Sequence, residues 1–152
     1  IALATPIIIW SGSLPSPPPD SPGIIRDETG AQTLLGYVVD LSAGDGSALC
    51  HLDIGPQHTN RHGGLHGGIL SCMLDNAMGF AASLTGDAAG DTRFLTLSMT
   101  TQYLAPARVG RVSARGTITG GGRSVVFAHG EVTDETGAVI ATGTGVYKRV
   151  KP

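Results

Sequence analysis

The chain has 152 residues and a net charge of −2, with 41% hydrophobic and only 14% charged residues. This length suits one domain with a substantial core, and the lack of a basic stretch argues against nucleic acid as a partner. The low charge content indicates that other subunits cover much of the surface. Two cysteines without a recurring spacing favour a reducing compartment, so a cytoplasmic location is expected.

Residues 1–32 are predicted to form an arm outside the folded domain. The apolar start, residues 1–10, is shorter than the roughly 20 apolar residues of a membrane span and has no basic leader, so neither a membrane segment nor a signal peptide is expected. The proline-rich stretch 13–23 is typical of an extended, semi-rigid segment. The folded domain is expected over residues 33–152.

The domain opens with two short β-branched runs joined by SAGDGS, which predict a β-hairpin over residues 33–54. A long apolar helix is predicted over residues 67–84. Alternation of apolar and polar residues then predicts four strands, over residues 93–106, 110–120, 123–134 and 138–150. Because short turns join these strands, the sheet should be antiparallel. The order of elements indicates an α+β domain in which a sheet of five to six strands wraps around one central helix.

The predicted helix is apolar on almost every side, as expected of a buried helix. The exception is a thin stripe of Ser71, Asp75 and Gly79 at a spacing of four. No cation stands one turn from Asp75, and an ionised carboxylate in an apolar setting is costly unless it is paired or used. Such a side chain can simply make a structural hydrogen bond or reach solvent, but we expect Asp75 to be functional.

Gly67 and Gly68 open the predicted helix, where the first backbone N–H groups have no partner within the helix and the dipole adds positive charge. Without a Cβ, a ligand can approach this backbone closely. The alternative is that the two glycines only allow a sharp turn into the helix. His66, the two glycines after it and an acid nine positions after the histidine together form a motif. This motif indicates a functional site more specifically than any of its parts.

His58, His62 and His66 have a spacing of four, which on a helix can make a zinc site. Four glycines lie among them and oppose a helix, so no metal is expected. Cys72 would need a nearby base to act as a nucleophile, and a packing role is the preferred interpretation.

The sequence GGGRS, residues 120–124, has two interpretations. It is either a plain hairpin turn or a backbone nest in which Arg123 binds a phosphate.

These features resemble the hot-dog fold thioesterases, in the phenylacetate-degradation (PaaI-like) subgroup, over residues 33–150. The resemblance depends on the pattern N-x5-HGG-x6-D, on YLAPARVG (103–110) and on the run from Gly122 to Tyr147. It implies hydrolysis of an acyl-CoA, with an aryl or a short- to medium-chain acyl group, to free acid and CoA without a further cofactor. A non-catalytic acyl-CoA-binding regulator and a hot-dog dehydratase or hydratase are the alternatives.

The resemblance also assigns roles to individual residues. Asp75 matches the catalytic carboxylate, and Gly67 matches the backbone donor to the thioester carbonyl. Asn60 matches an assisting amide, and Thr96 lies where relatives carry a hydroxyl beside the attacking water. The residues expected to bind the substrate are His66, Gly68, Gly122, Arg123 and Ser124. The extra HGG at residues 62–64 and the proline-rich arm depart from the family's pattern.

The spacing of Gly67 and Asp75 adds a geometric condition. Eight residues of helix span about 12 Å at roughly 1.5 Å per residue, whereas an attacking oxygen must lie about 3–3.5 Å from the carbonyl carbon. One helix cannot bring its own acid to its own start, but two antiparallel copies can. We therefore expect a homodimer as the minimal active unit and a homotetramer as the assembly. Asp75 can act as a general base or as the nucleophile.

Overall fold

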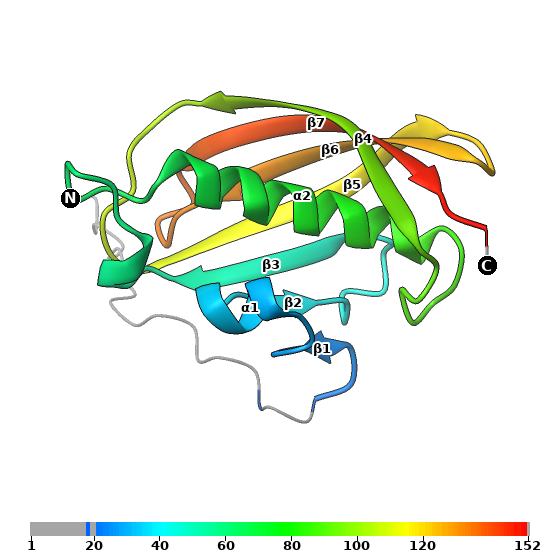
Figure 1. Ribbon diagram of the computed structural model, residues 1–152, viewed down its shortest axis with the longest axis horizontal. Coiled ribbons are helices and arrows are strands. Elements are labelled where there is room, and N and C mark those ends of the chain that lie inside the picture. Colours follow the sequence, from blue (N-terminus) through cyan, green and yellow to red (C-terminus); the bar gives the residue numbers. More distant parts are fainter. Residues whose placement is uncertain (1–17, 19–20, 152) are drawn as a thin grey trace, which may run out of the picture.

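The computed structural model describes residue 18 and residues 21–151. One antiparallel sheet of seven strands, in the order β1-β2-β3-β5-β6-β7-β4, curves around a single long helix (Figure 1). The strands are β1 (Ile24–Ile25), β2 (Val38–Asp40), β3 (Ala48–Asp53), β4 (Phe94–Tyr103), β5 (Arg111–Gly121), β6 (Val125–Thr133) and β7 (Val139–Arg149). The helices are α1 (Gly30–Leu35), the single 3₁₀ turn η1 (Pro56–His58) and the central α2 (Gly67–Leu84).

The predicted α+β class is confirmed, and α2 begins and ends at the predicted residues, 67 and 84. The sheet has one strand more than expected because β1, which the residue pattern does not predict, pairs with β2. The hairpin expected over residues 33–54 is present, but its first residues belong to α1, whose N-cap Thr29 accepts a hydrogen bond from the Gln32 N–H. The expected boundary between arm and domain, at residue 33, thus falls inside α1.

Glycines on three neighbouring strands allow α2 to lie very close to the sheet. Gly116, Gly130 and Gly143 stand opposite one another in the registers of β5, β6 and β7. A Cβ on Gly116 would overlap the backbone oxygen of Ala77 in α2, so the close approach requires glycine there. This contact determines the distance between α2 and the sheet, and therefore the distance between Asp75 and the strands.

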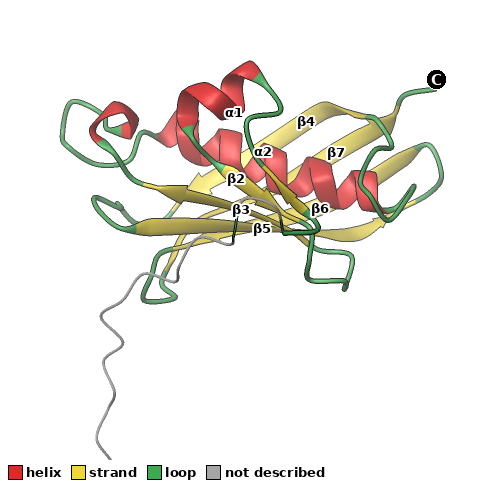
Figure 2. Ribbon diagram, turned by 90° about the horizontal axis from the view of Figure 1, so that it is seen from below, coloured by secondary structure: helices red, strands yellow, loops and turns green. Residues whose placement is uncertain are grey.

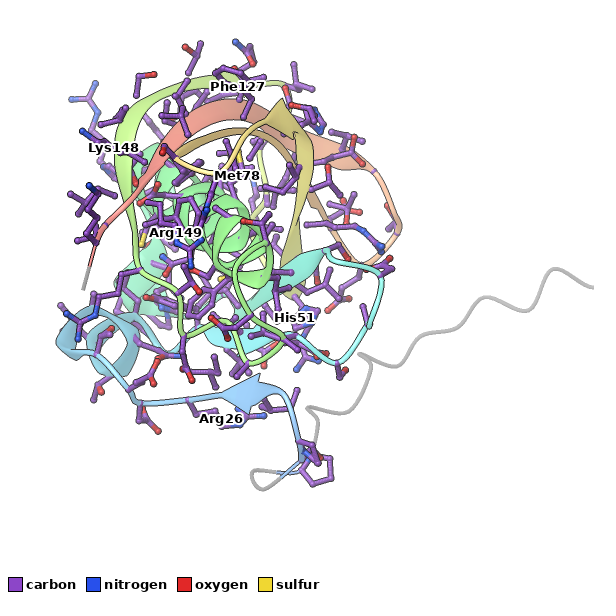
Figure 3. The ribbon with its side chains drawn as sticks, turned by 90° about the vertical axis from the view of Figure 1, so that its right-hand side faces the viewer. Arg26, His51, Met78, Phe127, Lys148 and Arg149 are labelled. Atoms are coloured by element: carbon purple, nitrogen blue, oxygen red, sulfur yellow. The ribbon has the colours of Figure 1, made fainter. Side chains whose placement is uncertain are left out.

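The core is continuous between α2 and the sheet that encloses it, and Figure 3, which views α2 end-on, shows Met78 between them. The buried apolar face of α2 includes Leu70, Met73, Leu74, Ala77 and Met78. α1 lies on the same side of the sheet as α2 (Figure 2). None of the helices between residues 21 and 151 combines the length and the apolar character that a membrane crossing requires.

β4 forms one edge of the sheet and carries exposed apolar side chains. Within the described residues it pairs only with β7, and a bulge between Thr96 and Ser98 interrupts their register. Leu95, Leu97 and Tyr103 are 59%, 56% and 55% exposed. An edge of this kind offers unpaired backbone groups and apolar surface to another chain.

Candidate active site

The start of α2 presents one backbone N–H that is left without an acceptor. His66 is the N-cap, and its Nδ1 accepts a hydrogen bond from the Gly68 N–H at 2.9 Å. The N–H groups of Ile69 and Leu70 both donate to the His66 carbonyl. The Gly67 N–H has no acceptor among residues 18 and 21–151, and it lies at the positive end of the helix dipole. Of the four N-terminal N–H groups, this one remains for a ligand.

Tyr103 of β4 covers this helix start. Its hydroxyl donates to the Gly67 carbonyl at 3.2 Å and lies 2.6 Å from Ser71 Oγ. A Cβ on Gly67 would come within 3.2 Å of the Tyr103 ring. A side chain at position 67 would therefore be forced against the ring, whereas glycine leaves the space beside the N–H open.

Asp75 lies in the middle of α2, and its carboxylate is bound through one oxygen. Thr96 Oγ1 on β4 donates to Oδ1 at 2.8 Å, and the Tyr147 hydroxyl on β7 donates to the same oxygen at 3.1 Å. Oδ2 has no hydrogen-bond partner within the described chain. Asp75 also lines a cavity of about 210 Å³, together with Asn76, Gly79, Phe80, Ser83, Phe94, Thr96 and Tyr147.

A second cavity, of about 660 Å³, lies at the turn between β5 and β6, where Arg123 and Ser124 line it. The remaining lining residues come from β4, from the end of β7 and from the two residues after it, and they are Leu95, Lys148, Arg149, Val150 and Lys151. Figure 3 shows Lys148 and Arg149 at this end of β7. Gly122 closes the turn through its N–H, which donates to the Val125 carbonyl at 2.7 Å, and it does not line the cavity. Four cations around one cavity, with no acidic side chain among its described lining residues, suit a phosphate.

Asn60 lies in the loop before α2, where it holds a turn. Its Oδ1 accepts hydrogen bonds from the N–H groups of His62 at 2.8 Å and Gly64 at 3.3 Å. The turn between them is closed by Gly63, whose φ is 73°. The side-chain NH₂ of Asn60 has no hydrogen bond to any described residue, so only this half of the amide is available to a substrate.

The three histidines at a spacing of four do not share a ligand, because the ring of each one makes its own hydrogen bonds. Both ring nitrogens of the buried His58 bind backbone groups. His62 accepts a hydrogen bond from Arg61, and His66 caps α2. No group of three or more His, Cys, Asp or Glu side chains in the described part of the chain could hold a metal ion.

Cys50 and Cys72 are both free thiols. Burial raises the pKa of the Cys72 thiol, and the nearby charge of Asp75 raises it further. A thiol with a raised pKa stays protonated near neutral pH, which opposes a nucleophilic role.

The predicted site residues thus fall into three places. The start of α2 gathers Asn60, His66, Gly67 and Gly68, its centre joins Asp75 to Thr96, and the β5–β6 turn holds Gly122, Arg123 and Ser124. Because α2 is continuous, Gly67 and Asp75 of one chain stay about 12 Å apart. Tyr147 is the contact that the residue pattern does not reveal, because its register opposite Thr96 exists only in the folded sheet.

A large antiparallel sheet curled around one long central helix is the architecture of the hot-dog fold. The chain belongs to the thioesterase superfamily, whose family model matches residues 62–141. It is 28% identical to human acyl-coenzyme A thioesterase 13 over 114 aligned residues. These residues make up 74% of this chain and 79% of the human protein.

Solved structures support the same placement. A variant of the phenylacetic acid degradation protein PaaI from Thermus thermophilus is 29% identical, with a TM-score of 0.62 over 69% of this chain and 86% of its own. A Bacillus halodurans protein solved with CoA is 27% identical, with a TM-score of 0.62 over 67% of this chain and 66% of its own. The resemblance to the PaaI-like hot-dog thioesterases is therefore confirmed.

Proposed function

We propose that the protein hydrolyses an acyl-CoA with an aryl or a short- to medium-chain acyl group to the free acid and CoA. The observation that carries this proposal is the Asp75 carboxylate, held through Oδ1 with Oδ2 free beside a cavity. The relatives support the thioester class, because one is named an acyl-coenzyme A thioesterase and another was solved with CoA.

In the proposed reaction the Gly67 N–H polarises the thioester carbonyl and stabilises the negative charge that develops on its oxygen. Asp75 either takes a proton from the attacking water or attacks the carbonyl carbon itself, giving an anhydride that water then opens. On both routes the carbon–sulfur bond breaks, and the CoA thiolate leaves and takes up a proton. Single-turnover hydrolysis in isotope-labelled water separates the routes, because only an anhydride can place the label in the Asp75 carboxylate.

The proposed active site needs two subunits. The reacting groups must lie about 3–3.5 Å apart, but Gly67 and Asp75 of one α2 are about 12 Å apart. Two antiparallel copies of α2 bring the acid of each chain to the helix start of the other. The exposed apolar edge of β4, beside Thr96, offers a surface for such a partner. A homodimer is thus the minimal active unit, and a homotetramer of two dimers is the proposed assembly.

The cavity beside Arg123 is proposed to hold phosphate groups of CoA. Arg123, Lys148, Arg149 and Lys151 supply four positive charges around it, and a guanidinium can bind phosphate through two parallel hydrogen bonds. We expect Arg123→Ala to raise KM for acyl-CoA more than it lowers kcat. An acyl-pantetheine analogue, which lacks the nucleotide, should respond little to the same substitution. An equal response of both substrates would contradict the phosphate role.

The test of the proposed function is thiol release from a panel of aryl-, short-chain and medium-chain acyl-CoAs. We expect hydrolysis of at least one class, and Asp75→Asn should bind acyl-CoA but lose about 10²–10⁴-fold in kcat, as when a general base is removed. Binding without thiol release by the native chain would favour the regulator, and a hydrated or dehydrated acyl product would favour the hydratase or dehydratase. Near-normal turnover by Asp75→Asn would refute the role of this acid.

A further inference from the structure

The Asp75 carboxylate has a buried partner that the proposed reaction does not use. Tyr147 is 1% exposed, and its hydroxyl donates to Asp75 Oδ1 at 3.1 Å, with the Asp75 carbonyl at 3.4 Å. The hydroxyl has no other hydrogen bond within the described residues. A buried tyrosine hydroxyl needs a partner, and here its partners are atoms of the proposed catalytic residue.

The register of the strands builds this contact into the sheet. Tyr147 and Thr96 are directly opposite in the register of β7 and β4, so both side chains reach α2 from neighbouring strands and meet at the same oxygen. The bulge after Thr96 interrupts the ladder at this point, as bulges do where a strand re-aims a side chain beside a site.

Gly145 leaves the space that the Tyr147 ring occupies, and the ring also packs against Gly79. A Cβ on Gly145 of β7 would lie 2.6 Å from a ring carbon and 3.0 Å from the hydroxyl. A Cβ on Gly79, one turn beyond Asp75 in α2, would lie 3.6 Å from the ring. The ring therefore packs between β7 and α2, which directs its hydroxyl to Asp75.

We propose that Tyr147 is a positioning residue that, with Thr96, holds Oδ1 of Asp75 so that Oδ2 stays free and oriented for the reaction. This inference rests on the proposed function of Asp75. Two donors on one oxygen prevent rotation of the carboxylate, and a supporting hydrogen bond of this kind is what keeps a catalytic group in its productive geometry.

The titratable groups that face Asp75 in the described chain are Tyr147 from β7 and Cys72 from α2 itself, whereas β4 contributes the neutral Thr96. Burial raises the pKa of the Tyr147 phenol, and the charge of Asp75 raises it further. The pKa of Cys72 is raised for the same two reasons. Both groups therefore keep their protons near neutral pH, so Tyr147 remains a hydrogen-bond donor to the carboxylate.

The test compares Tyr147→Phe with Tyr37→Phe. Tyr37 is a second buried tyrosine, but its hydroxyl donates to Asn76 at 3.2 Å and makes no hydrogen bond to Asp75. A hydrogen bond to a charged group contributes enough that its loss should lower kcat of Tyr147→Phe about tenfold or more. KM should change by less than about twofold. Tyr37→Phe should keep both the kcat and the KM of the native chain.

Asp75→Asn, measured beside them, distinguishes the possible failures. A native kcat in Tyr147→Phe, together with an inactive Asp75→Asn, would overturn this inference and leave the proposed function standing. Normal turnover by Asp75→Asn would overturn both. Gly145→Ala is a second variant that keeps the hydroxyl but pushes the ring from its position, and it should lower kcat with little change in KM, as Tyr147→Phe does. Thermal unfolding of each variant verifies that the fold is retained.

Discussion

Two HGG triplets stand four residues apart in this chain, and their backbones behave differently. In the first, residues 62–64, Gly63 adopts a φ of 73° and the N–H groups on either side of it bind Asn60. In the second, residues 66–68, neither glycine has a positive φ, and the triplet opens α2. The turn uses its donors within the loop, whereas the helix start leaves the Gly67 N–H free of any acceptor in the described chain.

The difference lies in the segment that each triplet leads into. The first leads into the buried Leu65, which bridges back to Thr59, so the chain has to reverse direction. The second leads into an apolar helix that the sheet encloses, and this helix fixes the direction of its first N–H groups. The second triplet therefore leaves an N–H without an acceptor in the described chain because a helix holds its backbone.

The largest effect is expected when the Gly67 N–H, the donor without an acceptor in the described chain, is removed. Gly67→Pro deletes the N–H at a position where a helix tolerates proline, and it leaves Asp75 intact. Loss of one oxyanion donor should lower kcat by about 10²–10³-fold. Gly67→Ala is the matched control, because it keeps the N–H and adds only a Cβ 3.2 Å from the Tyr103 ring. Equal losses in the two variants would mean that space, and not the donor, matters at this position.

The same variant tests whether the two parts of the site come from different subunits. When Gly67→Pro and Asp75→Asn subunits exchange fully, about half of the dimers are hybrids, and each hybrid has one site without a lesion. About a quarter of native activity should return. Hybrids identified by mass spectrometry but inactive would show that each chain builds its own site.

An element or a site residue can be predicted from the sequence when residues close to it along the chain determine it. It cannot be predicted when contacts between distant segments determine it. α2 and the four long strands can be predicted from strong periodicity, because each has an extended buried face. α1 and β1 escape prediction because a cap at Thr29 and pairing with β2 decide such short elements. In the candidate site, the helical spacing reveals Asp75, whereas Tyr147 lies 72 residues further along the chain and reaches it only through the register of β7.

An intermediate effect is expected at Asn60, which links the first triplet to the candidate site. Asn60→Ala leaves the N–H groups of His62 and Gly64 without their acceptor, which should cost about 1–3 kcal/mol of unfolding free energy. It should also lower kcat about tenfold, less than Gly67→Pro because the backbone donor remains. Asn60→Asp separates the two roles, since it keeps Oδ1 for the turn but loses the NH₂ donor. A native kcat in Asn60→Asp would leave this residue with the turn alone.

The smallest effect should distinguish the two histidines that begin the triplets. His66→Ala removes the acceptor of the Gly68 N–H at the N-cap of α2, and the loss of a capping side chain costs about 0.5–2 kcal/mol. His62→Ala removes an exposed ring that, among the described residues, accepts a hydrogen bond only from the adjacent Arg61, so it should change stability by no more than about 0.5 kcal/mol. Urea unfolding of both variants at one pH measures the difference. Since neither substitution touches a glycine, a larger loss in His62→Ala would mean that the turn, and not the cap on α2, stabilises this part of the chain.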